Sequence, residues 1–236
     1  MTEIYRKYAL RYDELVGAED YEGNLRAVLR RAINWKNKTV YEAGIGTGRV
    51  TEMYIRRIRR LYGFDREQHM LDRCTRNLAA YSGRMILACA DNYELQPAAE
   101  KADVFIEGWS FGHTVWEHRD NIDNAIARLI RNIDGTISPA GTAVIIESLG
   151  TNTEEVGAMN EALHCFYTAL EDEYGFERNT IRTDYRFDSC RRAAKVLGFF
   201  FGDEMGKKVL QRGKRVVPEY TGVWIRRGKY AGGRVS

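Results

Sequence analysis

The sequence predicts a single α/β domain built on a mostly parallel, doubly wound sheet. Short apolar strands alternate with helical segments between residues 38 and 147, the pattern of a parallel sheet with helices on both faces. The first strand runs directly into a glycine-rich turn that opens a helix. The 236 residues suffice for one such unit with a full core. No repeat, low-complexity segment or proline-rich linker marks a domain boundary.

Five strands are expected in the first part of the chain, at about 38–43, 61–65, 85–90, 103–107 and 141–147. The third of them is apolar throughout and is therefore expected to be buried. Helices are expected where apolar residues recur at helical spacing, at about 3–16, 19–34, 49–60, 67–80 and 120–134.

The last part of the chain is less regular. Its pattern predicts, in order, an acidic helix, an alternating strand, a second helix with a basic helical turn after it, and a final strand, at about 154–174, 180–187, 188–201 and 216–226.

The turn after the first strand contains three glycines, Gly44, Gly46 and Gly48. Without side chains, such a turn lets the backbone pass close to a ligand. Nineteen residues after Gly46, the second strand ends on Asp65, where an acid is placed to bind the hydroxyls of a ribose. These features predict a site for a nucleoside-containing cofactor, with an ordinary tight turn as the structural alternative.

The spacing helps to decide which cofactor this is. A dinucleotide site needs Gly-x-Gly-x-x-Gly, but here Arg49 stands where the third glycine would fall. Glu42, two residues before the first glycine, would repel a pyrophosphate, whereas it suits a cofactor that carries positive charge. S-adenosylmethionine has an ammonium and a sulfonium and no phosphate. The motif therefore favours S-adenosylmethionine over NAD.

With Glu42 before the turn and Asp65 after the next strand, residues 37–150 resemble the class I S-adenosylmethionine-dependent methyltransferases, whose first motif is acid-x-Gly-x-Gly-x-Gly. The rest resembles small bacterial members without an assigned substrate. The resemblance implies a seven-stranded sheet of order 3-2-1-4-5-7-6 whose seventh strand is antiparallel. It also implies an N-terminal helical lid, a cofactor-binding core, and C-terminal strands with a helical insertion, at 1–36, 37–150 and 151–236.

The resemblance implies a role for each cofactor-binding residue. The turn surrounds the methionine moiety, Asp65 binds the ribose hydroxyls, Met70 packs near the adenine, and Asp91 and Asn92 contact the adenine ring. The expected set is Tyr12, Glu42, Gly44, Gly46, Thr47, Asp65, Met70, Asp91, Asn92 and Glu107. Met70 is equally compatible with core packing, and acids at strand ends also cap helices and turns.

The loop after the fourth strand is expected to face the transferable methyl group, because ligands of open α/β sheets bind outside the carboxyl ends of the strands. It lacks the Asn/Asp-Pro-Pro-Tyr/Phe pattern of amino methyltransferases that act on DNA bases. His113 is the best candidate for a general base, and a structural histidine is an equal interpretation. The candidate substrate-binding residues are Tyr8, Trp109, His113 and Trp116, with simple packing as the alternative for each aromatic residue.

Charge is unevenly distributed, although the net charge is only +3. Residues 23–60 hold ten Lys and Arg against two acids, and residues 204–236 hold nine against two. Residues 147–174 hold seven acids and no base. Basic stretches can bind RNA, but helix-end arginines are also explained by the helix dipole, so a nucleic-acid partner is not favoured.

The remaining composition excludes several classes of protein. The four cysteines, Cys74, Cys89, Cys165 and Cys190, lack the paired spacing of metal ligands, so no metal is expected. Charged residues interrupt the N-terminal region, and no apolar run of about 18 residues occurs. The expected location is therefore cytoplasmic, with no signal peptide and no membrane partner.

The sequence thus predicts methyl transfer from S-adenosylmethionine to an oxygen, nitrogen or sulfur atom of a small molecule, by in-line attack in which positioning supplies much of the rate. Two alternatives stay open. One is an RNA methyltransferase that uses the basic stretches, and the other is a non-catalytic S-adenosylmethionine-binding module. The methyl acceptor and the oligomeric state are left open.

Overall fold

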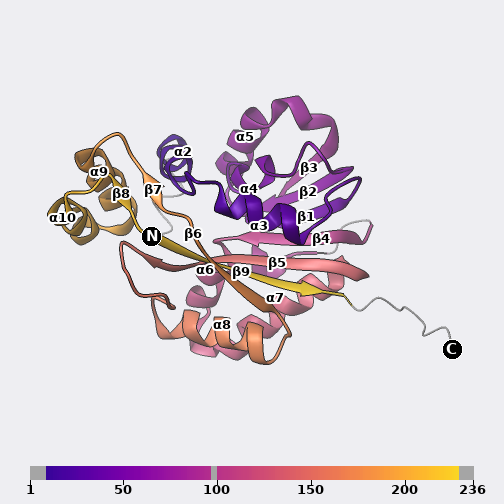
Figure 1. The fold of residues 1–236 in the computed structure, drawn as a ribbon. Coiled ribbons are helices and arrows are strands. Elements are labelled where there is room, and N and C mark those ends of the chain that lie inside the picture. Colours follow the sequence, from indigo (N-terminus) through magenta and orange to yellow (C-terminus); the bar gives the residue numbers. More distant parts are fainter. Residues whose placement is uncertain (1–8, 97–99, 229–236) are drawn as a thin grey trace. The chain divides into compact units, whose positions relative to one another are not determined.

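The computed structural model describes residues 9–96 and 100–228, which form two compact units (Figure 1). Each unit is assembled from separate stretches of the chain. Unit 1 comprises Met1–Ala32, Ser148–Met159 and Thr180–Gly222, and unit 2 comprises Ile33–Glu147, Asn160–Asn179 and Val223–Ser236. The single-domain organisation with an N-terminal lid therefore stays a prediction.

The main sheet has seven strands in the order β3-β2-β1-β4-β5-β9-β6. The strands are β1 (Thr39–Ala43), β2 (Arg60–Asp65), β3 (Met85–Cys89), β4 (Ala102–Gly108), β5 (Ile137–Thr151), β6 (Glu177–Arg182) and β9 (Glu219–Arg227). β1 pairs in parallel with β2 and β4, β2 with β3, and β4 with β5. Because β9, the last strand, lies between β5 and β6, the predicted strand order is confirmed.

The helices of unit 2 fall into two groups (Figure 1). The first group follows β1 and β2 and comprises α4 (Arg49–Glu52), α5 (Gln68–Asn77) and the short η1 (Ala79–Arg84). The second group comprises α6 (Phe111–Glu117), η3 (Arg119–Asn121), α7 (Ile122–Thr136) and α8 (Glu161–Asp172), of which α6, α7 and α8 pack on one another. Helix α6 lies within the segment that the sequence suggested was a loop.

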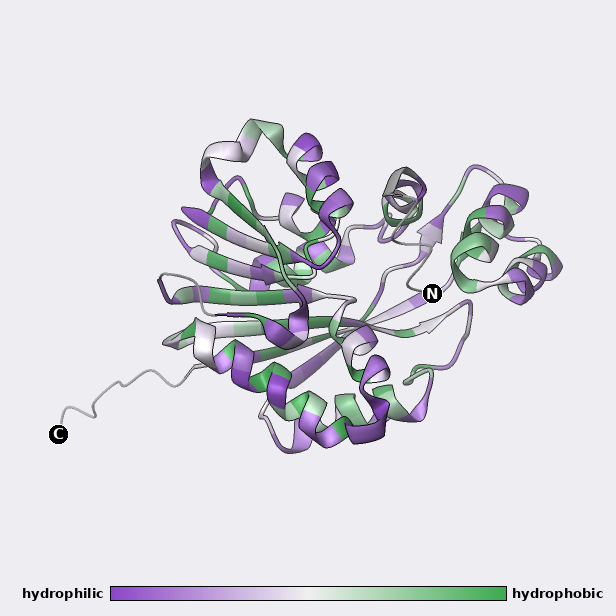
Figure 2. Cartoon of the chain, turned by 180° about the vertical axis from the view of Figure 1, so that it is seen from behind, coloured by the Kyte–Doolittle hydropathy of each residue, from purple (hydrophilic) through white to green (hydrophobic). Residues whose placement is uncertain are grey.

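The core of unit 2 lies along β1, β4 and β5. Tyr41 is fully buried and stacks between Phe64 and Phe105, with ring centroids 4.3 and 5.7 Å away. Figure 2 shows hydrophobic residues concentrated along these strands. Burial of such side chains is the main favourable contribution to folding. The packed core therefore supports the strand ends at which the candidate site lies.

Strand β3 differs from its predicted buried position. It forms the edge of the sheet, and Ile86 is 48% exposed. Between β3 and β4, the described residues form only the short η2 (Asn92–Glu94). An apolar run predicts a strand well, but its burial depends on neighbours that lie far away in the sequence.

The helix predicted for residues 49–60 ends at Glu52 and is followed by turns. The backbone N–H of Met53 donates to the Val50 carbonyl, and that of Tyr54 donates to the Thr51 carbonyl. These bonds span three residues, as in a tighter 3₁₀ turn. The predicted acidic helix is also shorter, because α8 begins at Glu161, after Asn160 accepts a hydrogen bond from the Leu163 N–H.

Unit 1 contains the predicted helical insertion as a hairpin of α9 (Cys190–Phe201) and α10 (Asp203–Arg212), together with α2 (Ala9–Ala18), α3 (Asn24–Ala32) and two short strands. The short strands, β7 (Tyr185–Arg186) and β8 (Val216–Val217), pair antiparallel. The predicted strands at 180–187 and 216–226 are therefore each divided in two. Helices α9 and α10 approach closely where two glycines meet, since a Cβ on Gly198 would lie 3.3 Å from the Gly206 Cα.

Within the described ranges, no helix combines the length and the apolar character needed to cross a membrane.

Candidate cofactor and active site

The turn after β1 uses backbone conformations that favour glycine. Gly44, Gly46 and Gly48 have φ angles of +61°, +55° and +90°, a region that L-residues with side chains rarely adopt. A Cβ on Gly44 would also overlap the Ser110 side chain. The turn therefore brings bare backbone to the carboxyl ends of β1 and β4.

Asp65, at the end of β2, hydrogen-bonds to the backbone of this turn. Its Oδ2 accepts a hydrogen bond from the Gly46 N–H at 2.9 Å, and its Oδ1 accepts one from the Glu67 N–H at 2.9 Å. Burial raises the pKa of Asp65, while these two hydrogen bonds oppose the rise. A carboxylate has about four acceptor positions, so Asp65 keeps capacity for two further donors.

Glu42 lies deeper than the turn and is 2% exposed. Its Oε2 accepts hydrogen bonds from the Thr51 hydroxyl at 2.6 Å and from the Tyr54 hydroxyl. Both donors come from α4 and the turn after it. Burial raises the pKa of Glu42 to about 7. The contacts of Glu42 are thus with the protein, and its action on a cationic cofactor stays a prediction.

Glu107, at the end of β4, is fully buried beneath the next loop. Its Oε1 accepts hydrogen bonds from the N–H groups of Ser110 and Phe111 and from the Ser110 hydroxyl. The Asn92 side-chain amide donates to the same hydroxyl at 3.0 Å. Among the described residues, nothing hydrogen-bonds to the buried Oε2 of Glu107. A buried acceptor left unpaired is costly, and a bound donor or cation would satisfy it.

Glu147 is a second buried carboxyl beside Glu107. It lies on β5, is 5% exposed, and accepts a hydrogen bond from the Gly112 N–H at 2.6 Å. Burial and then the charge of Glu107 raise the pKa of Glu147 well above its ordinary value, and burial also raises that of Glu107. Together the two glutamates bind the N–H groups that open α6.

Three buried glutamates with raised pKa values make stability depend on pH. Their folded-state pKa values lie above the ordinary 4.5, so their contribution is greatest below that value and is lost as pH rises through about 7 for Glu42. We expect Glu42→Gln to flatten the fall in unfolding free energy between about pH 4.5 and about pH 7, measured by urea denaturation.

The exposed Glu52→Gln is the matched control for the loss of one charge in the same region. The lowered pKa of His113 makes stability rise with pH, opposite to the effect of the glutamates. This contribution is the same in the wild type and in both variants. An unchanged pH profile for Glu42→Gln would contradict the proposed origin of the pH dependence.

Asp91 lies in an ion-pair group that the sequence did not reveal. Arg66 binds Glu117 through both carboxylate oxygens, and its guanidinium lies 3.9 Å from Asp91. The other oxygen of Asp91 accepts a hydrogen bond from the Tyr93 N–H at 2.8 Å and caps η2. This is the capping arrangement considered from the sequence, and the contact of Asp91 with adenine stays a prediction.

His113 and the two tryptophans occupy different surroundings. His113 is half-buried on α6, and burial and then the charge of Arg66 lower its pKa, which favours the neutral imidazole that a base requires. Trp109 follows β4 with a φ of +55°, and the Arg49 guanidinium lies 4.5 Å above its ring. Trp116 is 47% exposed. The substrate-binding roles stay predictions.

The other predicted residues are also placed. Thr47 is buried, and its carbonyl accepts a hydrogen bond from Asn77 at 3.0 Å, while Met70 is 5% exposed in α5. Tyr12 belongs to unit 1 and packs edge-on against Phe200, with ring centroids 6.3 Å apart. Tyr8 lies outside the described residues. In the described part of the chain, no three His, Cys, Asp or Glu side chains gather as a metal site.

Sequence reasoning missed Ser110, Arg66 and Glu147. Arg66 and Glu147 both stand at the ends of predicted strands, which was a usable signal, since side chains there meet at one edge of a parallel sheet. Ser110 lies in an aromatic-rich loop without a motif, and only the fold places it against Gly44.

A sheet of this order, with a three-glycine turn after β1 and an acid at the end of β2, defines the class I methyltransferase fold. Residues 40–133 match a family model described as a methyltransferase domain. The match covers less than half of the chain, and this segment therefore resembles a methyltransferase domain. The resemblance to class I S-adenosylmethionine-dependent methyltransferases is confirmed, and with it the expected enzyme class and cofactor. Among curated proteins, no sequence match is found.

Solved structures share the fold at low sequence identity. The 4+2 cyclase SpnF is 14% identical, with a TM-score of 0.62 over 95% of this chain and 94% of that one. A DhpI–SAM–HEP complex is 14% identical, with a TM-score of 0.60 over 95% of each chain. A candidate RNA methyltransferase from Pyrococcus horikoshii is 12% identical, with a TM-score of 0.54 over 87% of this chain and 83% of that one.

Proposed function

We propose that the protein transfers the methyl group of S-adenosylmethionine to an oxygen, nitrogen or sulfur atom of a small molecule. The observation that carries the proposal is the three-glycine turn held to Asp65 through the Gly46 N–H, within the segment that matches the methyltransferase model. When bound, S-adenosylmethionine supplies a methyl group already activated on a sulfonium.

The residues at the strand ends fit this cofactor. Asp65 has acceptor capacity left for the two ribose hydroxyls, and the bare turn lets a ligand approach the backbone at Gly44 and Gly46. The buried Oε2 of Glu107 has no hydrogen-bond partner among the described residues and offers an oxygen atom to a polar or cationic group of the cofactor. The neutral imidazole of His113 would accept the proton of an acceptor that binds protonated.

A small-molecule acceptor is favoured over RNA by the ion pairs of the basic stretches. Lys38 binds Asp103 at 3.0 Å, and Arg59 binds Glu100 at 3.0 Å. In the second stretch, Lys207 binds Glu204 at 2.7 Å. These acids offset part of the positive charge that an RNA backbone would need. An RNA acceptor would instead give binding that weakens steeply with added salt.

Calorimetry with S-adenosylmethionine, S-adenosylhomocysteine and NAD tests the cofactor. We expect one equivalent of either sulfur compound to bind and NAD to give no heat, because the turn lacks the dinucleotide spacing. Binding of NAD without any response to S-adenosylmethionine would overturn the proposal.

A screen of small metabolites with methyl-labelled cofactor tests the transfer itself. The cyclase SpnF shares this fold, and a fold alone does not define an activity. Label transferred to a metabolite supports the proposed reaction. Tight cofactor binding without transfer to any small molecule or to RNA favours the non-catalytic module.

A further inference from the structure

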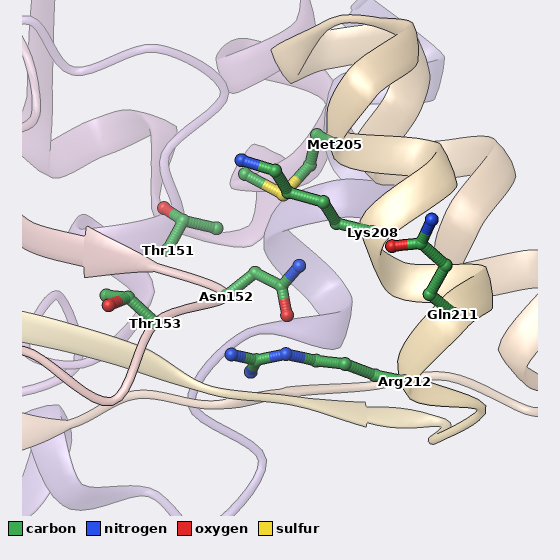
Figure 3. Close-up of a pocket in the computed structure, with 7 residues that line it drawn as sticks. All are labelled: Thr151, Asn152, Thr153, Met205, Lys208, Gln211 and Arg212. Atoms are coloured by element: carbon green, nitrogen blue, oxygen red, sulfur yellow. The ribbon is translucent and has the colours of Figure 1, made fainter.

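Unit 1 contains a pocket of about 540 Å³, and no residue of the glycine turn lines it. It is formed between the end of β5 and the helix α10 (Figure 3). The seven lining residues are Thr151, Asn152, Thr153, Met205, Lys208, Gln211 and Arg212. On α10, Met205, Lys208 and Arg212 recur at spacings of three and four, so they share one face of the helix.

The strongest indication of a ligand in this pocket comes from Asn152. It is 8% exposed, and neither its side-chain nitrogen nor its side-chain oxygen has a hydrogen-bond partner among the described residues. Figure 3 shows its amide directed toward α10, between Lys208 and Arg212. A buried amide without partners costs free energy, which a ligand in the pocket would recover.

The backbone holds Asn152 in this orientation. Its φ is +56°, in the left-handed region that asparagine tolerates better than most residues. Its N–H donates to the Pro218 carbonyl at 2.7 Å, and Gly150, two residues earlier, has a φ of +135°. The amide is therefore presented by a fixed turn, which lowers the entropy cost of binding.

The charges around the pocket favour a negatively charged ligand. Lys208 and Arg212 supply two cations, and Gln211 and Thr151 supply further hydrogen-bonding groups. Glu154 lies 3.6 Å from Arg212 but is itself 71% exposed, and such exposed pairs are weak. A ligand anion can therefore compete with Glu154 for the guanidinium.

We propose that this pocket binds a small organic anion, with its carboxylate or phosphate at Lys208 and Arg212 and a hydroxyl or amide group on Asn152. The planar guanidinium of Arg212 can form two hydrogen bonds with a carboxylate or a phosphate. The side-chain amide of Asn152 can both donate and accept a hydrogen bond. Every residue that carries the proposal belongs to unit 1, and none of them is among the residues proposed for methyl transfer.

Titration of the full-length protein with glycerol 3-phosphate, citrate and glycerol tests the proposal, observed by calorimetry and by the side-chain amide signal of Asn152 in NMR spectra. We expect at least one anion to bind and to shift the Asn152 signal, while neutral glycerol does neither. The two anions distinguish a phosphate from a carboxylate ligand. If neither binds, or if binding leaves the Asn152 signal unmoved, the proposal is wrong.

Two variants locate the binding. Lys208→Ala and Asn152→Asp should each weaken binding of the anion by about tenfold or more. The first removes a charged donor to the anion, and the second places a negative charge in the pocket beside it. Lys207→Ala is the matched control, because Lys207 is the exposed neighbour on α10 and does not line the pocket. An equal loss in Lys207→Ala, or no loss in the first two, would show nonspecific charge attraction and overturn the proposal.

Discussion

Gly44→Ala is expected to weaken S-adenosylmethionine binding by more than about tenfold. The added Cβ would overlap the Ser110 side chain, and the φ of +61° strains any residue with a side chain. The Ser110 side chain is kept in place, because its hydroxyl hydrogen-bonds with both Glu107 and Asn92. The turn must therefore move away from the position that serves the cofactor. Calorimetry measures the affinity, and circular dichroism measures the fold.

Gly213→Ala is the control for strain alone. Gly213 has a φ of +63°, nearly that of Gly44, but a Cβ there would meet nothing within 4 Å. Both variants should therefore lose some thermal stability, and only Gly44→Ala should lose cofactor affinity. If folded Gly44→Ala binds the cofactor like the wild type, the turn is not the cofactor site.

The strand order was predictable because it follows from local pattern and from a family resemblance. Apolar strands that alternate with helices leave few parallel arrangements, and the final strand lies between β5 and β6 as expected. The sequence placed Asp65 at the end of β2 and Gly46 in the turn after the adjacent strand β1, but the hydrogen bond between them was not predicted.

The surroundings of Glu42 were not predictable in the same way. Its partners are Thr51 and Tyr54, nine and twelve residues later. Thr51 lies in α4, and Tyr54 lies in the turns that follow the end of this helix at Glu52. Propensity favoured continuing that helix, whereas burial of the Tyr54 hydroxyl against a carboxylate favoured a turn. Tertiary packing outweighed local preference here.

The proximity of Glu107 and Glu147 also could not be predicted from the sequence, because it depends on long-range contacts. The two residues are forty positions apart in the sequence, and they meet because β4 and β5 are adjacent parallel strands. Their relation to Gly112 and Phe111 depends on α6, which the sequence did not predict because six of its seven residues, all except Glu117, rank low in helix propensity.

Asp65→Ala should reduce the affinity for S-adenosylmethionine by roughly ten- to a hundredfold. The substitution removes the charged acceptor expected for the ribose hydroxyls, and hydrogen bonds to charged groups contribute about 1.5–3 kcal/mol. It also frees the Gly46 and Glu67 N–H groups, so some of the loss comes from a looser turn. A second ligand is needed to separate these two effects.

S-adenosylhomocysteine without its 2′-hydroxyl provides that separation. The wild type should bind this analogue about tenfold more weakly than the parent compound, because Asp65 loses a donor. Asp65→Ala should bind both compounds equally weakly, since a looser turn affects them alike. This comparison is a double-mutant cycle between one side chain and one hydroxyl. Undiminished discrimination by Asp65→Ala, or unchanged affinity in a folded variant, would place the ribose elsewhere.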